Sequence, residues 1–180
     1  MTAVKGRAGR FATLAPMCPG PRQGATSAEF SGPQEAAALV LQARAIAGAG
    51  DAARRLMSGR KLALLSPSPG DDSASEFVQA ASALGAHVSV VQPGLDAFSS
   101  ARQVEATARM LGQLYDAVEC QQLPASLVRL IARSAGIPVF AGLAMAAHPT
   151  AALAAELGGD APLAERRRCI LQAALLIATG

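Results

Sequence analysis

The chain has 180 residues and a mass of 18.2 kDa, which suits one domain with its own core but is too short for two ordinary enzyme domains. Hydrophobic residues make up 51% and charged residues 16%, a composition that argues against disorder over most of the length. Aromatic residues are only 3%, and the net charge of +3 is spread thinly along the chain. These values exclude aromatic stacking platforms and basic patches for nucleic acid.

The three cysteines are Cys18, Cys120 and Cys169, which are too far apart for a disulfide framework or a zinc-binding pair. We therefore predict no metal and no cofactor, and a reducing, cytoplasmic location. No apolar run approaches the roughly 20 residues that cross a bilayer, so no membrane association is expected.

Residues 1–28 are rich in Arg, Gly and Pro and contain no acidic residue. This composition resembles that of a transit peptide, but it lacks the apolar region of a secretory signal. We interpret residues 1–28 as a flexible N-terminal tail and residues 29–180 as a single domain.

From Gly32 onward, segments with helical periodicity alternate with short apolar runs, a pattern typical of a parallel sheet covered by helices. A first helix begins at Pro33 and ends near Gly48 and Gly50. In chain order the pattern then predicts a strand at 61–65, helix 73–84, strand 87–91, helix 104–114, strand 116–120, helix 125–135, strand 137–140, helix 149–157 and helix 163–177. The fold class is α/β, with three layers and a four-stranded, mostly parallel sheet.

Two loops follow strands at the edge where parallel sheets bind ligands: SPSPGDDS after the first strand and GLAMAAHP after the fourth. In the first loop Ser68, Gly70, Asp71, Asp72 and Ser73 lie at the start of a helix, whose free amides can hold a phosphate. The two aspartates favour a second reading, because acids at a helix N-terminus satisfy its dipole and repel an anion.

Each of the other candidate side chains can have either a functional role or a purely structural one. His148 can donate to a ligand oxygen or satisfy its own loop, and Cys120 can be a nucleophile or a packing residue. His87 lies on a strand and is the weaker histidine candidate. The run Arg166–Arg168 reads as a solvated helix face, with anion or subunit contacts as the alternative.

Residues 61–157 resemble the carbamoyl-phosphate-binding domain of the aspartate and ornithine carbamoyltransferases, and the ornithine branch slightly more. The segments that carry the resemblance are KLALL, SEFVQAASALGAHV, VEATARMLGQLYDAV and IPVFAGLAMAAHPTAAL, and their spacing matches that of the family. The resemblance implies the fold of that domain. It also implies a trimer, because in the family the first domain makes the trimer contacts.

The sequence departs from the family at its ligand-binding positions. The family holds carbamoyl phosphate with an S-T-R-T-R run, and the aligned residues here are Gly70 to Ala74, so both arginines are absent. A further family arginine aligns with Gln121, and the glutamine of the HPxQ motif aligns with Ala151. Among the polar residues with which the family contacts its ligand at these positions, this chain keeps only His148.

The segment AERRRCILQAALLIATG resembles the closing helix of the family and follows the helix at Pro149 almost at once. We therefore expect residues 161–180 to be a closing C-terminal helix, and the amino-acid-binding domain of the family to be missing. No catalytic residue is predicted. The leading hypothesis is an inactive carbamoyltransferase-like domain that acts by self-association, as a homo-oligomer, or by binding another protein. The alternatives are a small-molecule binder or transferase-like enzyme that uses the same crevice for a small polar ligand, and a gene remnant without function.

Overall fold

The protein is described here by a computed structural model, which covers residue 30 and residues 32–92 and 94–180. The tail predicted for residues 1–28 lies outside the described residues. The sheet contains β1 (Lys61–Leu65), β2 (His87–Val91), β3 (Ala117–Cys120) and β4 (Val139–Ala141). Its strand order is β2-β1-β3-β4, and every neighbouring pair is parallel. The predicted four-stranded parallel sheet is confirmed.

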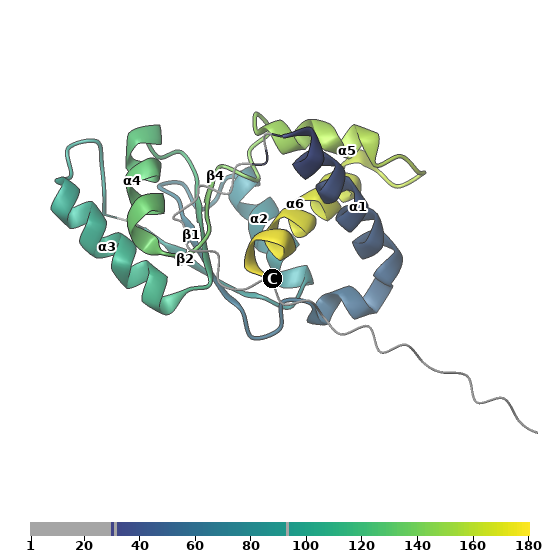
Figure 1. Cartoon of the computed structure of the whole chain (residues 1–180), viewed down its shortest axis with the longest axis horizontal. Helices are drawn as coiled ribbons and strands as arrows, with labels where there is room; N and C mark the ends of the chain where they lie inside the picture. Colours follow the sequence, from purple (N-terminus) through teal and green to yellow (C-terminus); the bar gives the residue numbers. More distant parts are fainter. Residues whose placement is uncertain (1–29, 31, 93) are drawn as a thin grey trace, which may run out of the picture.

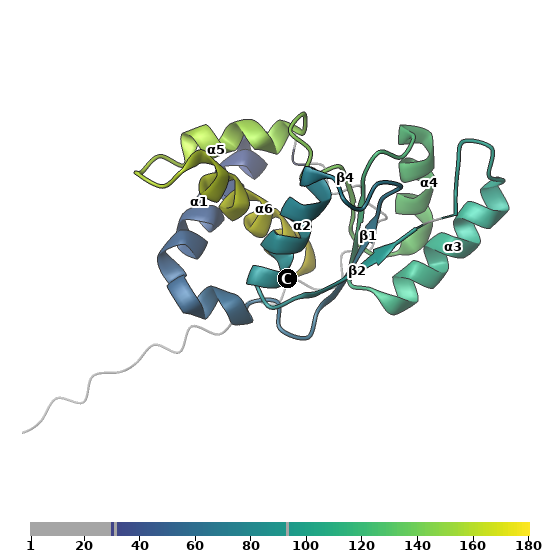
Figure 2. The same ribbon diagram turned by 180° about the vertical axis from the view of Figure 1, so that it is seen from behind.

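The helices are α1 (Pro33–Ala49), α2 (Asp72–Ala83), α3 (Ala101–Leu114), α4 (Ala125–Ala135), α5 (Leu153–Glu156) and α6 (Leu163–Thr179), with two 3-10 helices, η1 (Gly50–Arg55) and η2 (Pro149–Ala152). Helices α3 and α4 cover one face of the sheet, and α2, α1, α5 and α6 lie on the other (Figures 1 and 2). The molecule therefore has the three predicted layers.

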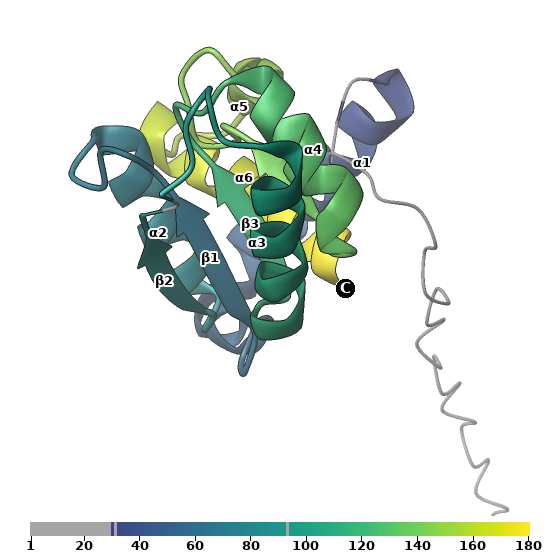
Figure 3. The ribbon, with the colours of Figure 1, turned by 90° about the vertical axis from the view of Figure 1, so that its left-hand side faces the viewer.

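The central strand β1 explains why both faces need helices. Leu62 and Leu64 belong to the core under α2, whereas Ala63 and Leu65 belong to the core under α3 and α4. All four side chains are fully buried, as expected for a central strand of a parallel sheet. Strand β2 lies at the edge of the sheet, as Figure 3 shows.

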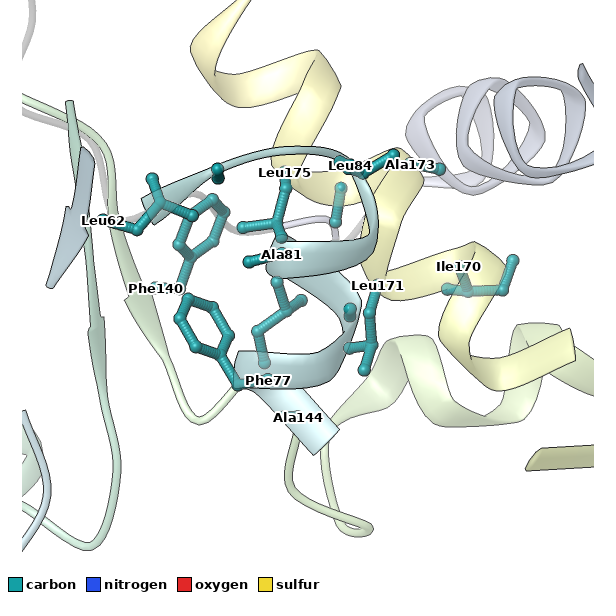
Figure 4. Close-up of a cluster of buried hydrophobic side chains, with 14 of the residues drawn as sticks. Leu62, Phe77, Ala81, Leu84, Phe140, Ala144, Ile170, Leu171, Ala173 and Leu175 are labelled. Carbon is teal, nitrogen blue, oxygen red and sulfur yellow. The ribbon is translucent and has the colours of Figure 1, made fainter. Parts of the chain in front are cut away.

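Helix α6 completes the core on the α2 side. Its residues 170–175 are all buried, and the helix packs against α1 and α2. Figure 4 shows Leu171 and Leu175 of this helix beside α2 in a cluster that includes Phe77 and Phe140, and Ile170 belongs to the same buried cluster. The predicted C-terminal helix is thus present with an apolar partner, and the assignment of residues 29–180 to one domain remains a prediction.

Several predicted elements differ in detail, and α3, for example, begins at Ala101 rather than at residue 104. The helix predicted at 149–157 is a 3-10 turn, η2, that the His148 side chain caps, followed by the short α5. Strand β4 begins at Val139 rather than at residue 137, since Pro138 cannot donate to a neighbouring strand. Among the described helices, none is long and apolar enough to cross a membrane.

Candidate functional site

The candidate site lies at the carboxyl ends of β1, β3 and β4, which meet at one edge of the parallel sheet. Three segments surround it: residues 66–73 between β1 and the first turn of α2, residues 121–124 after β3, and residues 142–148 after β4. None of these segments contains an arginine or a lysine. We call this region the crevice.

The first segment places its acids at the start of α2. Asp71 occupies the N-cap position, but its side chain makes no cap hydrogen bond to the helix. Its carboxylate instead accepts a hydrogen bond from Nε2 of Gln122. Asp72 begins the helix and is exposed, as are Gly70 and, in part, Ser68. The expectation that both aspartates cap the helix is therefore wrong for the Asp71 side chain, which reaches across to the β3 segment.

Ser73 is a second predicted residue that the structure connects to the segment after β3. Its Oγ donates to Oε1 of Gln121 at 3.2 Å, and its carbonyl accepts from Nε2 of Gln121, also at 3.2 Å. Gln121 is fully buried. This position, where the resemblance implies an arginine, therefore holds a neutral amide that already bonds to the protein.

Glu119 is a residue of the crevice that the sequence analysis missed. It lies on β3, is fully buried, and accepts from Nε2 of Gln121 at 3.2 Å and from the Ala144 amide at 3.5 Å through Oε1. Burial raises the pKa of this carboxyl to about 7, although hydrogen bonds from Gln121 and from the Leu143 and Ala144 amides act in the opposite direction. Its second oxygen, Oε2, has no hydrogen-bond partner within the described residues.

The side chain of His148 turns back on its own loop. Its Nδ1 lies 2.8 Å from Oγ1 of Thr150 and 3.3 Å from the Thr150 amide, so the ring caps η2. Burial lowers the pKa of this imidazole, which favours the neutral form. His87 is exposed at the start of β2, at the opposite end of the sheet from the crevice.

The arginine run of α6 is only in part the solvated face that the sequence suggested. Nη2 of Arg167 donates to the carbonyl of Ala144 at 2.6 Å, and its Nε lies 3.4 Å from Oε2 of Glu76. Arg166 is half-buried, whereas Arg168 is exposed. The solvated-face prediction is wrong for Arg167 because this residue lies one turn before the buried Leu171 on the same face of the helix.

Cys120 is buried at the end of β3, on the side that faces α3 and α4. Burial, together with the nearby Glu119 carboxylate, raises the pKa of its thiol. A thiol that ionises so reluctantly is a poor nucleophile, which favours the packing role. The structure shows no metal-holding group of three or more His, Cys, Asp or Glu side chains in the part of the chain that it describes.

Comparison with known proteins identifies the family. A family profile described as "Aspartate/ornithine carbamoyltransferase, carbamoyl-P binding domain" matches residues 26–157. An ornithine carbamoyltransferase of Actinobacillus pleuropneumoniae is 37% identical over 98 residues, which are 54% of this chain and 29% of the relative. One of Cutibacterium acnes is 35% identical over 99 residues, 55% of this chain and 30% of the relative. The alignments thus span about three tenths of the length of these curated relatives.

Solved structures give the same result. Ornithine carbamoyltransferase from Thermus thermophilus superposes with a TM-score of 0.56 and 27% identity, over 72% of this chain and 46% of that one. The enzyme from Gloeobacter violaceus gives 0.52 and 25% identity, over 69% and 39% of the two chains. By fold and by sequence, the chain belongs to the aspartate/ornithine carbamoyltransferase family and contains its carbamoyl-phosphate-binding domain.

Proposed function

We propose that this carbamoyltransferase-family domain does not hold carbamoyl phosphate as the family does, and that it acts without catalysis, through association with further copies of itself. The observation that carries the proposal is which residues occupy the three positions aligned with the family arginines, and how buried those residues are. Asp72 is an exposed acid, Ala74 is only 1% exposed, and Gln121 is buried and bonded to Ser73. A longer cationic side chain has no free space at two of these three positions.

Energetics support weak anion binding. A hydrogen bond between a charged side chain and phosphate contributes about 1.5–3 kcal/mol, so losing three of them weakens binding by roughly a thousandfold or more. The crevice also adds the carboxylates of Asp71 and Asp72, whose charges repel a phosphate. Arg167 does not compensate, because its guanidinium is bonded to the Ala144 carbonyl.

Exposed apolar side chains support the association. Phe98, in the segment between β2 and α3, is 94% exposed, and Met110 and Leu114 of α3 are 51% and 55% exposed. The last two lie one turn apart on one helix face, and Val90 of the edge strand is 47% exposed. Burial of such side chains between copies is favourable, and the family resemblance implies a trimer. We expect this oligomer in the cytoplasm.

Light scattering after size exclusion, over a hundredfold range of protein concentration, tests the association. We expect an oligomer in the wild type and a monomer in the double variant Phe98→Ser, Met110→Lys. Leu41→Lys is the matched control, because Leu41 is 72% exposed on α1, on the other side of the sheet, and its replacement should leave the oligomer intact. A wild type that stays monomeric at the highest concentration contradicts the proposal.

Isothermal titration calorimetry with carbamoyl phosphate tests the statement that the domain does not hold this ligand as the family does. We expect no saturable binding up to about 1 mM by the wild type, and a gain of binding in Asp72→Arg, because residue 72 is exposed and has room for a longer side chain. Saturable binding by the wild type below that concentration contradicts the loss of function.

A second candidate function is a small-molecule site for a cationic or polar ligand in the same crevice. The two aspartates at the start of α2 favour an ammonium or guanidinium group over a phosphate. A thermal-shift screen with ornithine and polyamines tests this candidate. Stabilisation that is lost in Asp71→Asn, Asp72→Asn supports it, and no stabilisation by any of these cations rejects it.

A further inference from the structure

One buried side-chain cluster joins all three segments of the crevice. Gln121 bonds to Ser73 in the first turn of α2 and to Glu119 on β3, and Glu119 bonds to the Ala144 amide after β4. Glu119 and Gln121 are both fully buried. We call Glu119, Gln121, Ser73 and the Ala144 amide the crevice cluster. While these bonds are intact, water does not reach the Glu119 carboxyl.

The surroundings of Glu119 are poorly suited to a negative charge. Its neighbours in the sheet register are Leu64 on β1 and Phe140 on β4, and both are apolar. No cation is among the groups that shift the ionisation of Glu119, whose hydrogen bonds come from one side-chain amide and from backbone amides. One carboxyl oxygen is left without a partner within the described residues. A buried carboxylate of this kind is stable only if it is protonated or if it gains water.

The ionisable groups on the elements around Glu119 do not supply that cation. Helix α2 contributes the acids Asp71, Asp72 and Glu76, and the β3 and β4 segments contribute Cys120 and His148, of which the imidazole favours its neutral form. The arginine of α6 that reaches this region, Arg167, binds the Ala144 carbonyl and faces Glu76.

We propose that the crevice cluster is a proton-controlled closure: the closed cluster, in which Glu119 is buried, is stable while this carboxyl is protonated, and loss of the proton favours an open state in which water reaches the carboxyl. The inference does not depend on self-association or on the identity of a ligand. It concerns the access of any solute to the carboxyl ends of the strands.

Linkage gives the size of the effect. The carboxyl has an ordinary pKa of 4.5 when it is solvated and a pKa of about 7 when it is buried in the closed cluster. The opening equilibrium therefore rises with pH between these two values. From pH 5 to pH 8 it increases by about 70-fold, and it stays nearly constant at higher pH.

Amide hydrogen exchange of the full chain, followed by NMR at pH 5, 6, 7 and 8 and corrected for the intrinsic chemical rate, tests the proposal. We expect the opening equilibrium of the Ala144 amide to increase by about 70-fold across this range. The amide of Ile131, buried in α4, reports global unfolding and should remain at least tenfold better protected. A flat Ala144 profile, or equal protection of the two amides, overturns the proposal.

Two variants and one direct titration complete the test. Glu119→Gln should give a flat Ala144 profile, and Glu105→Gln on α3, across the sheet, should retain the wild-type rise. A rise in the first variant or its loss in the second overturns the assignment to Glu119. Should Glu119→Gln fail to fold, carbon-13 titration of the Glu119 carboxyl in the wild type decides. A midpoint near 7 that coincides with the exchange profile supports the proposal, and a midpoint near 4.5 rejects it.

Discussion

Replacement of Gly112 by alanine is expected to destabilise the protein, because the backbone at the end of α4 lies directly against this residue of α3. A Cβ atom on Gly112 would lie 1.9 Å from the carbonyl oxygen of Ala135 and 3.0 Å from its carbonyl carbon. Contacts below 3.0 Å are essentially absent for real Cβ atoms, so the two backbones must separate by at least 1.1 Å at this point. A backbone carbonyl cannot rotate away as a side chain can.

The magnitude follows from two opposing effects. Alanine is favoured over glycine by about 1 kcal/mol in a helix interior, whereas overpacking of a closely packed contact costs about 1–3 kcal/mol. Because the clash is with backbone and the helices share a core, the cost dominates, and we expect a net loss of about 1–2 kcal/mol. Gly48→Ala is the matched control. It makes the same change near the end of α1 with no atom within 4 Å, and it should stabilise the protein by about 0.5–1 kcal/mol.

Equilibrium urea denaturation monitored by far-UV circular dichroism measures both changes. The midpoint should fall for Gly112→Ala and rise for Gly48→Ala, with slopes equal to that of the wild type. A Gly112→Ala variant as stable as the wild type would refute the close approach of α3 and α4 inferred from this position.

Three further outcomes are expected. The pKa of Glu119 is raised from 4.5 to about 7 in the folded state. As the pH rises from 4.5 to 7, the wild type should therefore lose about 3 kcal/mol of unfolding free energy relative to Glu119→Gln. Unfolding free energies that change in parallel with pH in the two proteins would contradict this. Arg167→Leu removes the bond to Ala144 and should cost about 2 kcal/mol in urea denaturation, whereas an unchanged midpoint would show that the bond contributes nothing. Burial raises the pKa of Asp116, but the Lys61 amide and the Arg60 guanidinium outweigh it and lower the pKa below 3.8. Asp116→Asn should therefore cost about 1 kcal/mol near pH 6. This difference should disappear as the pH falls through the lowered pKa of Asp116, and thermal denaturation as a function of pH can follow it.

Much of the fold was predictable because its elements carry strong local signals. The runs at 61–65 and 87–91 match β1 and β2, and α4 ends at Gly136 as predicted. The family resemblance over residues 61–157 agrees with the profile match over 26–157. The short elements were predicted less well, since η1 and η2 depend on local capping and proline geometry that periodicity does not report.

The site was predicted only in part. Ser73 was placed correctly at the start of α2, but the sequence offered no reason to pair it with Gln121, which lies 48 residues away. Two residues had usable signals that were overlooked. Glu119 is an acid inside a four-residue apolar strand, and Arg167 precedes Leu171 by one helical turn. Whether Ser68, Gly70, Asp71, Asp72, Ser73 and His148 bind a ligand remains a prediction.

The sequence by itself determined the longer helices and strands, the parallel α/β class and the family, because these follow from the spacing of apolar residues and from motifs along the chain. Only the tertiary structure decided what the crevice contains. The strand order β2-β1-β3-β4 places β3 between β1 and β4, so the side chains of Glu119 and Gln121 meet segments distant in sequence. Burial and hydrogen bonding across those segments raise the pKa of Glu119, and neither can be read from a linear pattern.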